Sequence, residues 1–267
     1  MQKFERIIKP TTISEGVEGE IGSTDRMLDN NTNNSFGRIS IVPRKIIQLL
    51  MSIIIFLLAA SLCLVILKYI WNANSFPFRV FNKLFNFDLE ANIPALFSTL
   101  LLMAASFLLL FIYKTRPSKT NYWLFLSLLF TFLAIDEGVQ IHEKFNQLKP
   151  EIEVLKDTNL RYVWVFPYSI LLIVLFIFLK KFIFSLPRRT YKLMIISAVI
   201  FVGGAVGVEM IHDFFKVQYG GNENMYLEFL ICLEEVGEMT GTTIFIFALL
   251  DYIAPRNSPI YFGTTSD

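Results

Sequence analysis

The residues best suited to chemistry in this 267-residue chain lie near the ends of long apolar runs, where packing alone would not favour them. The first group contains Asp136, Glu137, His142 and Glu143, in the pattern Asp-Glu-x4-His-Glu. Imidazole and carboxylate groups are common ligands of iron, manganese and zinc, and they also transfer protons. This group could therefore bind a metal ion or act in acid–base catalysis.

Two further clusters repeat this chemistry. The segment Glu209-Met-Ile-His-Asp213 contains the second of only two histidines in the chain. Its Glu-x-x-His spacing is the one by which a single helix offers two ligands, here Glu209 and His212, to one metal. The third cluster lies inside the last apolar run and consists of Glu234, Glu235 and Glu238.

The composition indicates where these residues must reside. Apolar residues make up 54% of the chain and the mean hydropathy is +0.52, which is typical of a protein that crosses a membrane several times. A formal net charge of +1 gives no argument for a nucleic-acid partner. The two cysteines form neither a disulfide framework nor a CxxC metal motif.

Six apolar segments are each close to the ~20 residues that cross a bilayer. Only helices satisfy their backbone in lipid, so we expect an all-α, polytopic membrane helix bundle. The segments are approximately 46–69, 93–113, 121–142, 162–184, 191–212 and 225–252. A polar, Asn-rich disordered tail (1–43) precedes this transmembrane domain (44–253), and a short tail (254–267) follows it. Between the first two spans, the aromatic and basic segment 76–87 suits the membrane interface.

Charge in the connecting loops predicts the orientation. The loops 114–119 and 180–192 contain several lysines and arginines and no acid, so the positive-inside rule places them in the cytoplasm. Both tails are then cytoplasmic (N-in, C-in), in a cell membrane that we expect to be a bacterial inner membrane. With this orientation, all the polar clusters fall near one level, at the outer face.

Helical geometry then predicts which acids share a face. At about 100° per residue, Asp136, Gln140 and Glu143 fall within an arc of about 60°. The cluster Glu209–Asp213 spans about 100°, and so does the cluster Glu234–Glu238. The spacings Gly203-x-x-x-Gly207 and Gly237-x-x-x-Gly241 would let neighbouring helices approach closely.

Ionisable groups inside a membrane cost several kcal/mol unless they are paired or bound to metal, so these clusters are candidates for function. We expect one or two divalent ions of iron, manganese or zinc. The predicted metal ligands are Asp136, Glu137, His142, Glu209, His212, Glu234 and Glu238. The predicted general bases or residues that orient the ligands are Glu143, Glu235 and Asp213.

The leading hypothesis is a metal-dependent enzyme that acts on a lipid or another amphiphile within the membrane. The sequence does not separate oxidative from hydrolytic chemistry, nor does it indicate an oligomeric state. A transporter of divalent cations or protons would use the same acids, and it predicts a polar path to the cytoplasm. A scaffold or sensor with a purely structural cluster predicts that no metal binds.

Three motifs give the chain a resemblance to a family of bacterial multipass membrane proteins with no established activity. They are Phe87-Asp-Leu-Glu-Ala-Asn-Ile-Pro94, the segment Ile135–Glu143, and Glu234-Glu-Val-Gly-Glu-Met-Thr-Gly241. The resemblance covers residues 45–253 and implies a membrane bundle, without an activity to carry over.

Overall fold

The computed structural model describes residues 39–89, 91–115, 120–141, 144, 165–254 and 260–262. These residues belong to one unit, Ile39–Phe262. His142 and Glu143 of the predicted site lie outside the described residues, and so does most of both predicted tails.

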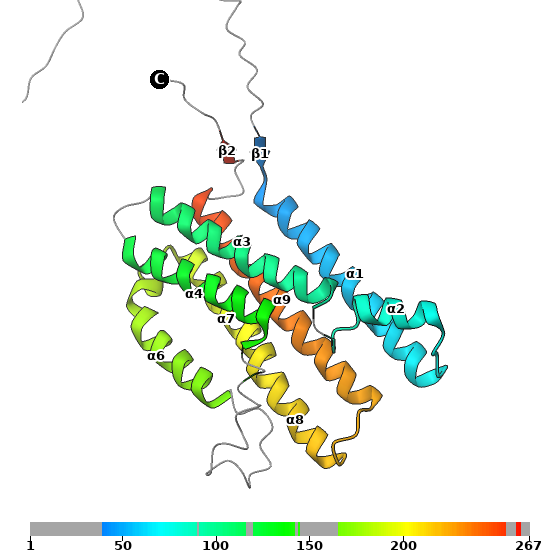
Figure 1. Cartoon of the computed structure of the whole chain (residues 1–267). Helices are drawn as coiled ribbons and strands as arrows, with labels where there is room; N and C mark the ends of the chain where they lie inside the picture. The colour runs from blue at the N-terminus through cyan, green and yellow to red at the C-terminus, as the bar shows by residue number, and fades with distance from the viewer. Residues whose placement is uncertain are drawn as a thin grey trace, which may run out of the picture. The chain divides into compact units, whose positions relative to one another are not determined.

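The described residues contain six helical segments that are long and apolar enough to span a membrane, which confirms the predicted all-α membrane bundle (Figure 1). The fifth span joins three elements without a break, because α7 continues through a π-helical turn, η3, into α8. The spans are α1 (Pro43–Ile70), α3 (Ile93–Thr115), α4 (Thr120–Val139), α6 (Val165–Phe184), α7–η3–α8 (Arg188–Val202, Gly203–Val208 and Glu209–Gln218) and α9 (Met225–Ile253).

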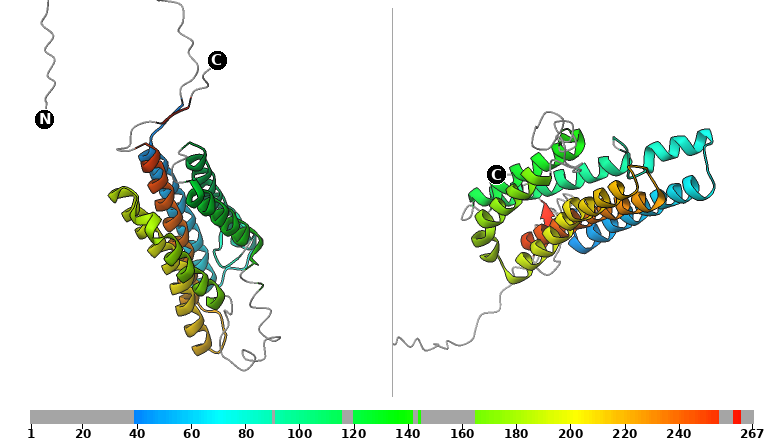
Figure 2. Two further views of the ribbon diagram at one scale, coloured as in Figure 1. Left: turned by 90° about the vertical axis from the view of Figure 1, so that its left-hand side faces the viewer. Right: turned by 90° about the horizontal axis from the view of Figure 1, so that it is seen from below.

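Helix α9 is the centre of the bundle. Of its most apolar stretch, 56% is buried, compared with 11% for α6. It packs against α1, α3, α7 and η3, whereas α6 lies at the edge (Figure 2). Side chains of α9 therefore face several other spans at once, which makes this helix the natural carrier of a shared site.

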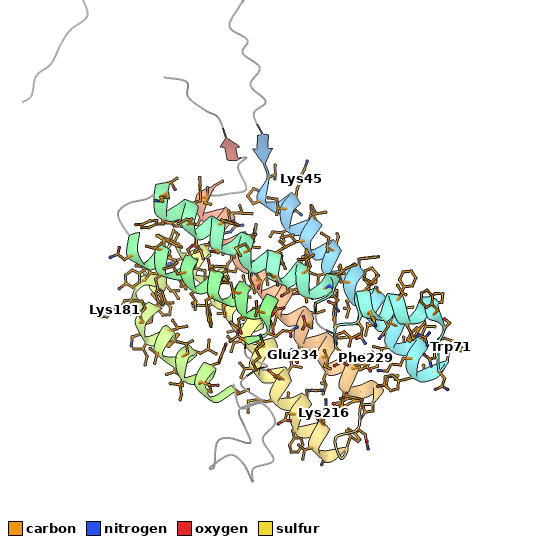
Figure 3. The ribbon with its side chains drawn as sticks, viewed as in Figure 1. Lys45, Trp71, Lys181, Lys216, Phe229 and Glu234 are labelled. Atoms are coloured by element: carbon orange, nitrogen blue, oxygen red, sulfur yellow. The ribbon has the colours of Figure 1, made fainter. Side chains whose placement is uncertain are left out.

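The bundle has two ends that differ in character. At the strand end, β1 (Ile39–Ile41) pairs antiparallel with β2 (Ile260–Phe262); both strands lie within segments predicted as tails. The acidic end is the opposite one, where α4 finishes and α9 begins. Figure 3 places Lys45 near the strand end, Lys216 at the acidic end and Glu234 between α8 and α9.

Aromatic packing fills the strand end. Trp123 is fully buried, with its ring centroid 4.9 Å from that of Phe182 and 5.1 Å from that of Tyr252. Ile112 and Leu249 are fully buried in the same core. The rings join α4, α6 and α9, so this end of the bundle is held by dense apolar contact.

The predicted interfacial segment folds as a short amphipathic helix, α2 (Phe76–Phe85), and its position in a membrane interface stays a prediction. Ser75 caps it by accepting a hydrogen bond from the Phe78 amide at 3.4 Å, and Pro77 occupies the first turn, where a missing N–H costs nothing. The helix packs against α1 and α3. It thereby positions the connection to α3 that borders the site described below.

Candidate functional site

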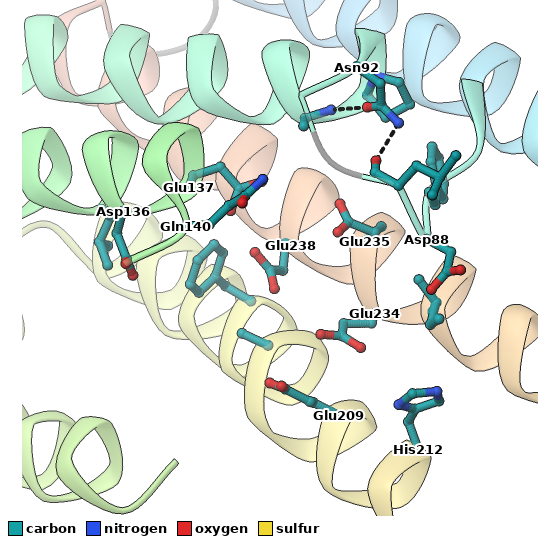
Figure 4. A pocket seen from close by; sticks show the side chains of 18 of the residues that line it. Asp88, Asn92, Asp136, Glu137, Gln140, Glu209, His212, Glu234, Glu235 and Glu238 are labelled. Atoms are coloured by element: carbon teal, nitrogen blue, oxygen red, sulfur yellow. Dashed lines mark hydrogen bonds between the residues drawn. The ribbon is translucent and has the colours of Figure 1, made fainter. Parts of the chain in front are cut away.

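A pocket of about 370 Å³ lies at the acidic end, between α3, α4, α8 and α9 (Figure 4). The connection between α2 and α3 closes one side. Acidic side chains dominate the polar part of its described lining: Asp88, Asp136, Glu137, Glu209, Glu234, Glu235 and Glu238. Clusters that are far apart in the sequence thus surround one space.

The structure places most of the predicted site residues in this lining. Of the predicted metal ligands, Asp136, Glu137, Glu209, His212, Glu234 and Glu238 line the pocket. Glu235, a predicted base, also lines it, whereas Asp213 is half-buried and lies outside the lining. His142 and Glu143 are not among the described residues.

The pocket is not a preformed metal cage. No three His, Cys, Asp or Glu side chains of the described residues are arranged to hold a metal ion. Figure 4 shows Glu209, Glu234 and Glu238 directed into the same space from α8 and α9. Any ion would therefore have to draw these side chains together.

The pocket acids of helix α4, Asp136 and Glu137, lie in its last turn. The helix ends at Val139, three residues before the predicted end, because Gln140 adopts a left-handed conformation with φ +60°. The arc predicted for Glu143 lies outside the described residues. A non-glycine residue in this region stores strain, and such strain is concentrated at functional sites.

Asp136 is buried and is held in place by a neighbouring span. The Tyr168 hydroxyl of α6 donates a hydrogen bond to Asp136 Oδ2 at 3.0 Å. This hydroxyl connects the edge helix to the pocket.

The π-helical turn η3 comes directly before Glu209 and accounts for the placement of α8. A π turn adds one residue to the helical repeat, which rotates every following side chain around the axis. Both Glu209 and His212 are buried after this turn, 5% and 3% exposed. Such turns are frequent at functional sites, and here one orients two candidate ligands.

Glycines set the spacing between the fifth span and α9. A Cβ on Gly204 would lie 2.8 Å from the Glu234 carbonyl oxygen, and one on Gly241 would lie 2.7 Å from the Phe201 amide nitrogen. The predicted close approach at Gly237 and Gly241 is confirmed. The prediction for Gly203 and Gly207 was wrong, because a Cβ on either would have no neighbour within 4 Å. Gly204 makes the contact instead.

Like charges surround Glu238 in the pocket. The carboxylates of four other residues act on Glu238 from α4, α8 and α9, namely Glu137, Glu235, Glu234 and Glu209. Lys216 is the only lysine or arginine among the described lining residues, and its Nζ forms an ion pair with Glu223. Carboxylates packed this closely favour binding a cation.

The connection between α2 and α3 contributes residues that the predicted site omitted. Asn92 caps α3 through its Oδ1, which accepts a hydrogen bond from the Ala95 amide at 3.0 Å. Its Nδ2 donates to the Asn86 carbonyl at 2.7 Å, so Asn92 ties the connection together (Figure 4). The signal for this part of the pocket was present in the motif Phe87–Pro94, in its Asp and Asn residues.

Asp88 lines the pocket from the connection between α2 and α3, outside the membrane-spanning helices. Although the residue retains exposed surface, burial of much of its carboxyl among protein atoms raises its pKa to about 6. The charges of Glu228 and Glu223 raise the pKa further, while Lys216 and Lys68 oppose them. Asp88 thus responds to the same excess of negative charge as the pocket.

A second acidic position lies close by on α9 but is neutralised. Glu228 is only 1% exposed, and its Oε1 accepts hydrogen bonds from Lys68 Nζ and, at 2.8 Å, from the Tyr69 hydroxyl. Both donors come from α1. Glu228 therefore serves to join α1 to α9.

Comparison with known proteins identifies the family of this chain. The family described as "Domain of unknown function (DUF8692)" matches residues 50–253. The chain belongs to this family. The match to DUF8692 begins within α1 and includes the other five spans and the whole described pocket. It agrees with the resemblance to a family without an established activity. No curated protein and no solved structure matches the chain.

Proposed function

We propose that the chain is a metal-dependent membrane enzyme whose acidic pocket binds one or two divalent ions and acts on the polar part of a lipid or another amphiphile. One observation carries this proposal: carboxylates from α4, α8 and α9 converge on Glu238, with one lysine among the described lining residues. A bound cation of charge +2 would relieve that repulsion.

The donor set fits iron, manganese or zinc. Glu209 and His212, one helical turn apart on α8, and Glu234 and Glu238, one turn apart on α9, offer carboxylate and imidazole ligands from two adjacent helices. Asp136 and Glu137 would complete the set from α4. A bound ion would supply Lewis-acid or redox chemistry, and Glu235 would hold or transfer a proton in the same pocket.

The substrate class follows from the surroundings. The pocket lies among membrane-spanning helices, so a molecule that reaches it from the bilayer must itself be amphiphilic. With both tails in the cytoplasm, as the loop charges predict, the pocket would open towards the outer leaflet. The enzyme would then act on the head of a lipid in that leaflet.

Transport of cations or protons remains the alternative use of the same acids, and the shape of the pocket favours a one-sided site instead. Its deepest described residues on α3, α4 and α7 are Leu102, Leu133 and Phe201, all apolar. Beyond them, the rings of Phe130 and Phe245 stack at 4.5 Å. The described polar groups of this layer are hydroxyls, such as the hydrogen-bonded Ser106, Ser127 and Thr131 between α3 and α4. None of these hydroxyls is an ionisable group of the kind that relays cations or protons through a membrane.

The proposal is tested by adding metal to metal-free protein in detergent and following thermal unfolding. Mn²⁺, Fe²⁺ or Zn²⁺ at about 100 times its Kd should stabilise the protein by about 2.7 kcal/mol. The same addition should leave Glu238→Gln unchanged and should still stabilise Glu228→Gln, which alters a carboxylate outside the pocket. Absence of any shift in the wild type, or an equal shift in Glu238→Gln, would refute the proposal.

A further inference from the structure

An apolar groove runs along α6 beside the acidic pocket. It encloses about 370 Å³, within the ~300–1,000 Å³ range of small-molecule sites. Leucine, isoleucine, valine, methionine, alanine and phenylalanine make up nearly all of its lining, which comes from α4, α6, α7, η3 and α9. Along α6 the lining extends from Tyr168 to Ile183, about 22 Å at 1.5 Å per residue.

The groove and the pocket adjoin each other. Four side chains line both: Leu133, Tyr168, Phe201 and Ala205. At this shared wall, Tyr168 marks the change from apolar to polar surroundings. It lines the groove, and its hydroxyl donates to Asp136 of the pocket. The two adjoining spaces together are therefore amphiphilic, with carboxylates lining the pocket and hydrocarbon side chains lining the groove.

Helix α6 is attached at its two ends and leaves the groove between them. Near the strand end, the Tyr122 ring stacks on Phe182 at 4.8 Å, and Phe125 meets Phe178 edge-on at 5.2 Å. At the acidic end the attachment is the hydrogen bond from Tyr168. Among the side chains between these attachments, Phe176 is 62% exposed, so the groove is open to the lipid side.

We propose that this groove binds the hydrocarbon chain of an amphiphile with one long chain, which enters from the bilayer beside α6 and places its polar head in the acidic pocket. The placement of the head rests on the proposed function, whereas the chain site rests on the groove alone. A chain lying along ~22 Å of α6 would exceed the ~15 Å depth of one hydrocarbon leaflet, so the site selects long chains.

The test uses hexadecanol with a photoreactive diazirine in mid-chain, added to metal-free protein in lipid nanodiscs. Cross-links mapped by mass spectrometry should concentrate on Leu126–Leu133 and Leu171–Leu179, and unlabelled hexadecanol should compete. Ala198→Phe places a ring in the groove and should reduce labelling at least about tenfold, as expected if the ring displaces several methylene groups. Val199→Phe is the matched control, because Val199 is 67% exposed and lies outside the lining, and labelling should persist.

Equal labelling of all lipid-facing helices, or equal labelling of Ala198→Phe and Val199→Phe, would overturn the proposal and show ordinary lipid contact only. Because the labelling needs no metal, the two proposals fail separately. Specific labelling in a protein that binds no metal would refute the proposed metal-dependent enzyme and support the proposed binding of a hydrocarbon chain in the groove. Metal binding without specific labelling would support the metal site and refute the chain-binding groove.

Discussion

Helix α9 carries acids in two settings, and the difference between them separates stability from function. Glu228 near its start and Asp251 near its end are almost fully buried, and each pairs with a cation of another helix: Glu228 with Lys68, and Asp251 with Arg189 at 3.2 Å. Between them, Glu238 faces the charges of other carboxylates from α4, α8 and α9. The acids of α9 that join it to other helices are thus paired with cations, whereas Glu238 in the pocket lies among other acids.

Under the proposed function, this contrast means that the pocket is more than a by-product of packing. The strand end shows how these helices pack when stability alone is required, with Trp123 buried among Phe182 and Tyr252. Converging carboxylates at the acidic end reduce stability, and proteins retain such costs where a site needs them. Substitutions at Lys68, Glu238 and Asp88 test this contrast, with stability effects that we expect to decrease in that order.

Lys68→Met should leave the buried Glu228 carboxylate of α9 without its cationic partner. This variant should show the largest loss of stability. Glu228 is 1% exposed, and a buried charge that loses its partner costs about 3–5 kcal/mol. Because the Tyr69 hydroxyl still donates to Glu228, we expect a loss near 3 kcal/mol in the free energy of unfolding, measured by denaturant titration in detergent. The double variant Lys68→Met/Glu228→Gln should recover at least half of it. A loss below about 1 kcal/mol, typical of exposed pairs, would contradict the contrast.

Glu238→Gln should act in the opposite direction. The substitution removes the carboxylate on which the other pocket acids act, so the metal-free protein should gain about 1 kcal/mol of stability, as is common when a strained functional site is relaxed. The free energy of unfolding without metal measures it. Glu228→Gln is the matched control on the same helix and should lower stability. If both variants destabilise alike, the pocket acids are structural.

Asp88→Asn should give the smallest effect, visible only as a pH dependence. The pKa of Asp88 is raised from 3.8 to about 6, so the folded protein disfavours its ionised form. Stability is therefore lost as pH rises from about 3.8 through about 6, and the full cost is present above that range. The Tm of Asp88→Asn should equal that of the wild type near pH 4 and exceed it at pH 7. A difference that is independent of pH would show that the charge is not responsible.

Much of the fold was predictable from the sequence, because length and hydropathy define a membrane-spanning helix almost without reference to tertiary contacts. The six spans appear close to their predicted positions. The common level of the clusters around Asp136, Glu209 and Glu234 was also predictable. It follows from chain direction, since each cluster lies in the half of its span nearer the acidic end.

The remainder depended on local backbone geometry that residue types do not reveal. The left-handed Gln140 ends α4 early, and the π turn Gly203–Val208 changes which residues of α8 face the pocket. Glycine spacing indicated close packing but not its register, so Gly204 was missed. The role of Tyr168 depends on α6 lying beside α4, a pairing that connecting-loop charges do not encode.

The most direct test of the proposed metal site is elemental analysis of purified protein, with the wild type compared with His212→Ala, Glu234→Gln and the control Glu228→Gln. We predict near-stoichiometric iron, manganese or zinc in the wild type and in Glu228→Gln. Both pocket variants should lose it at least about tenfold while remaining folded by size-exclusion chromatography. Folded wild-type protein without metal, or metal that survives both pocket variants, would contradict the metalloenzyme proposal.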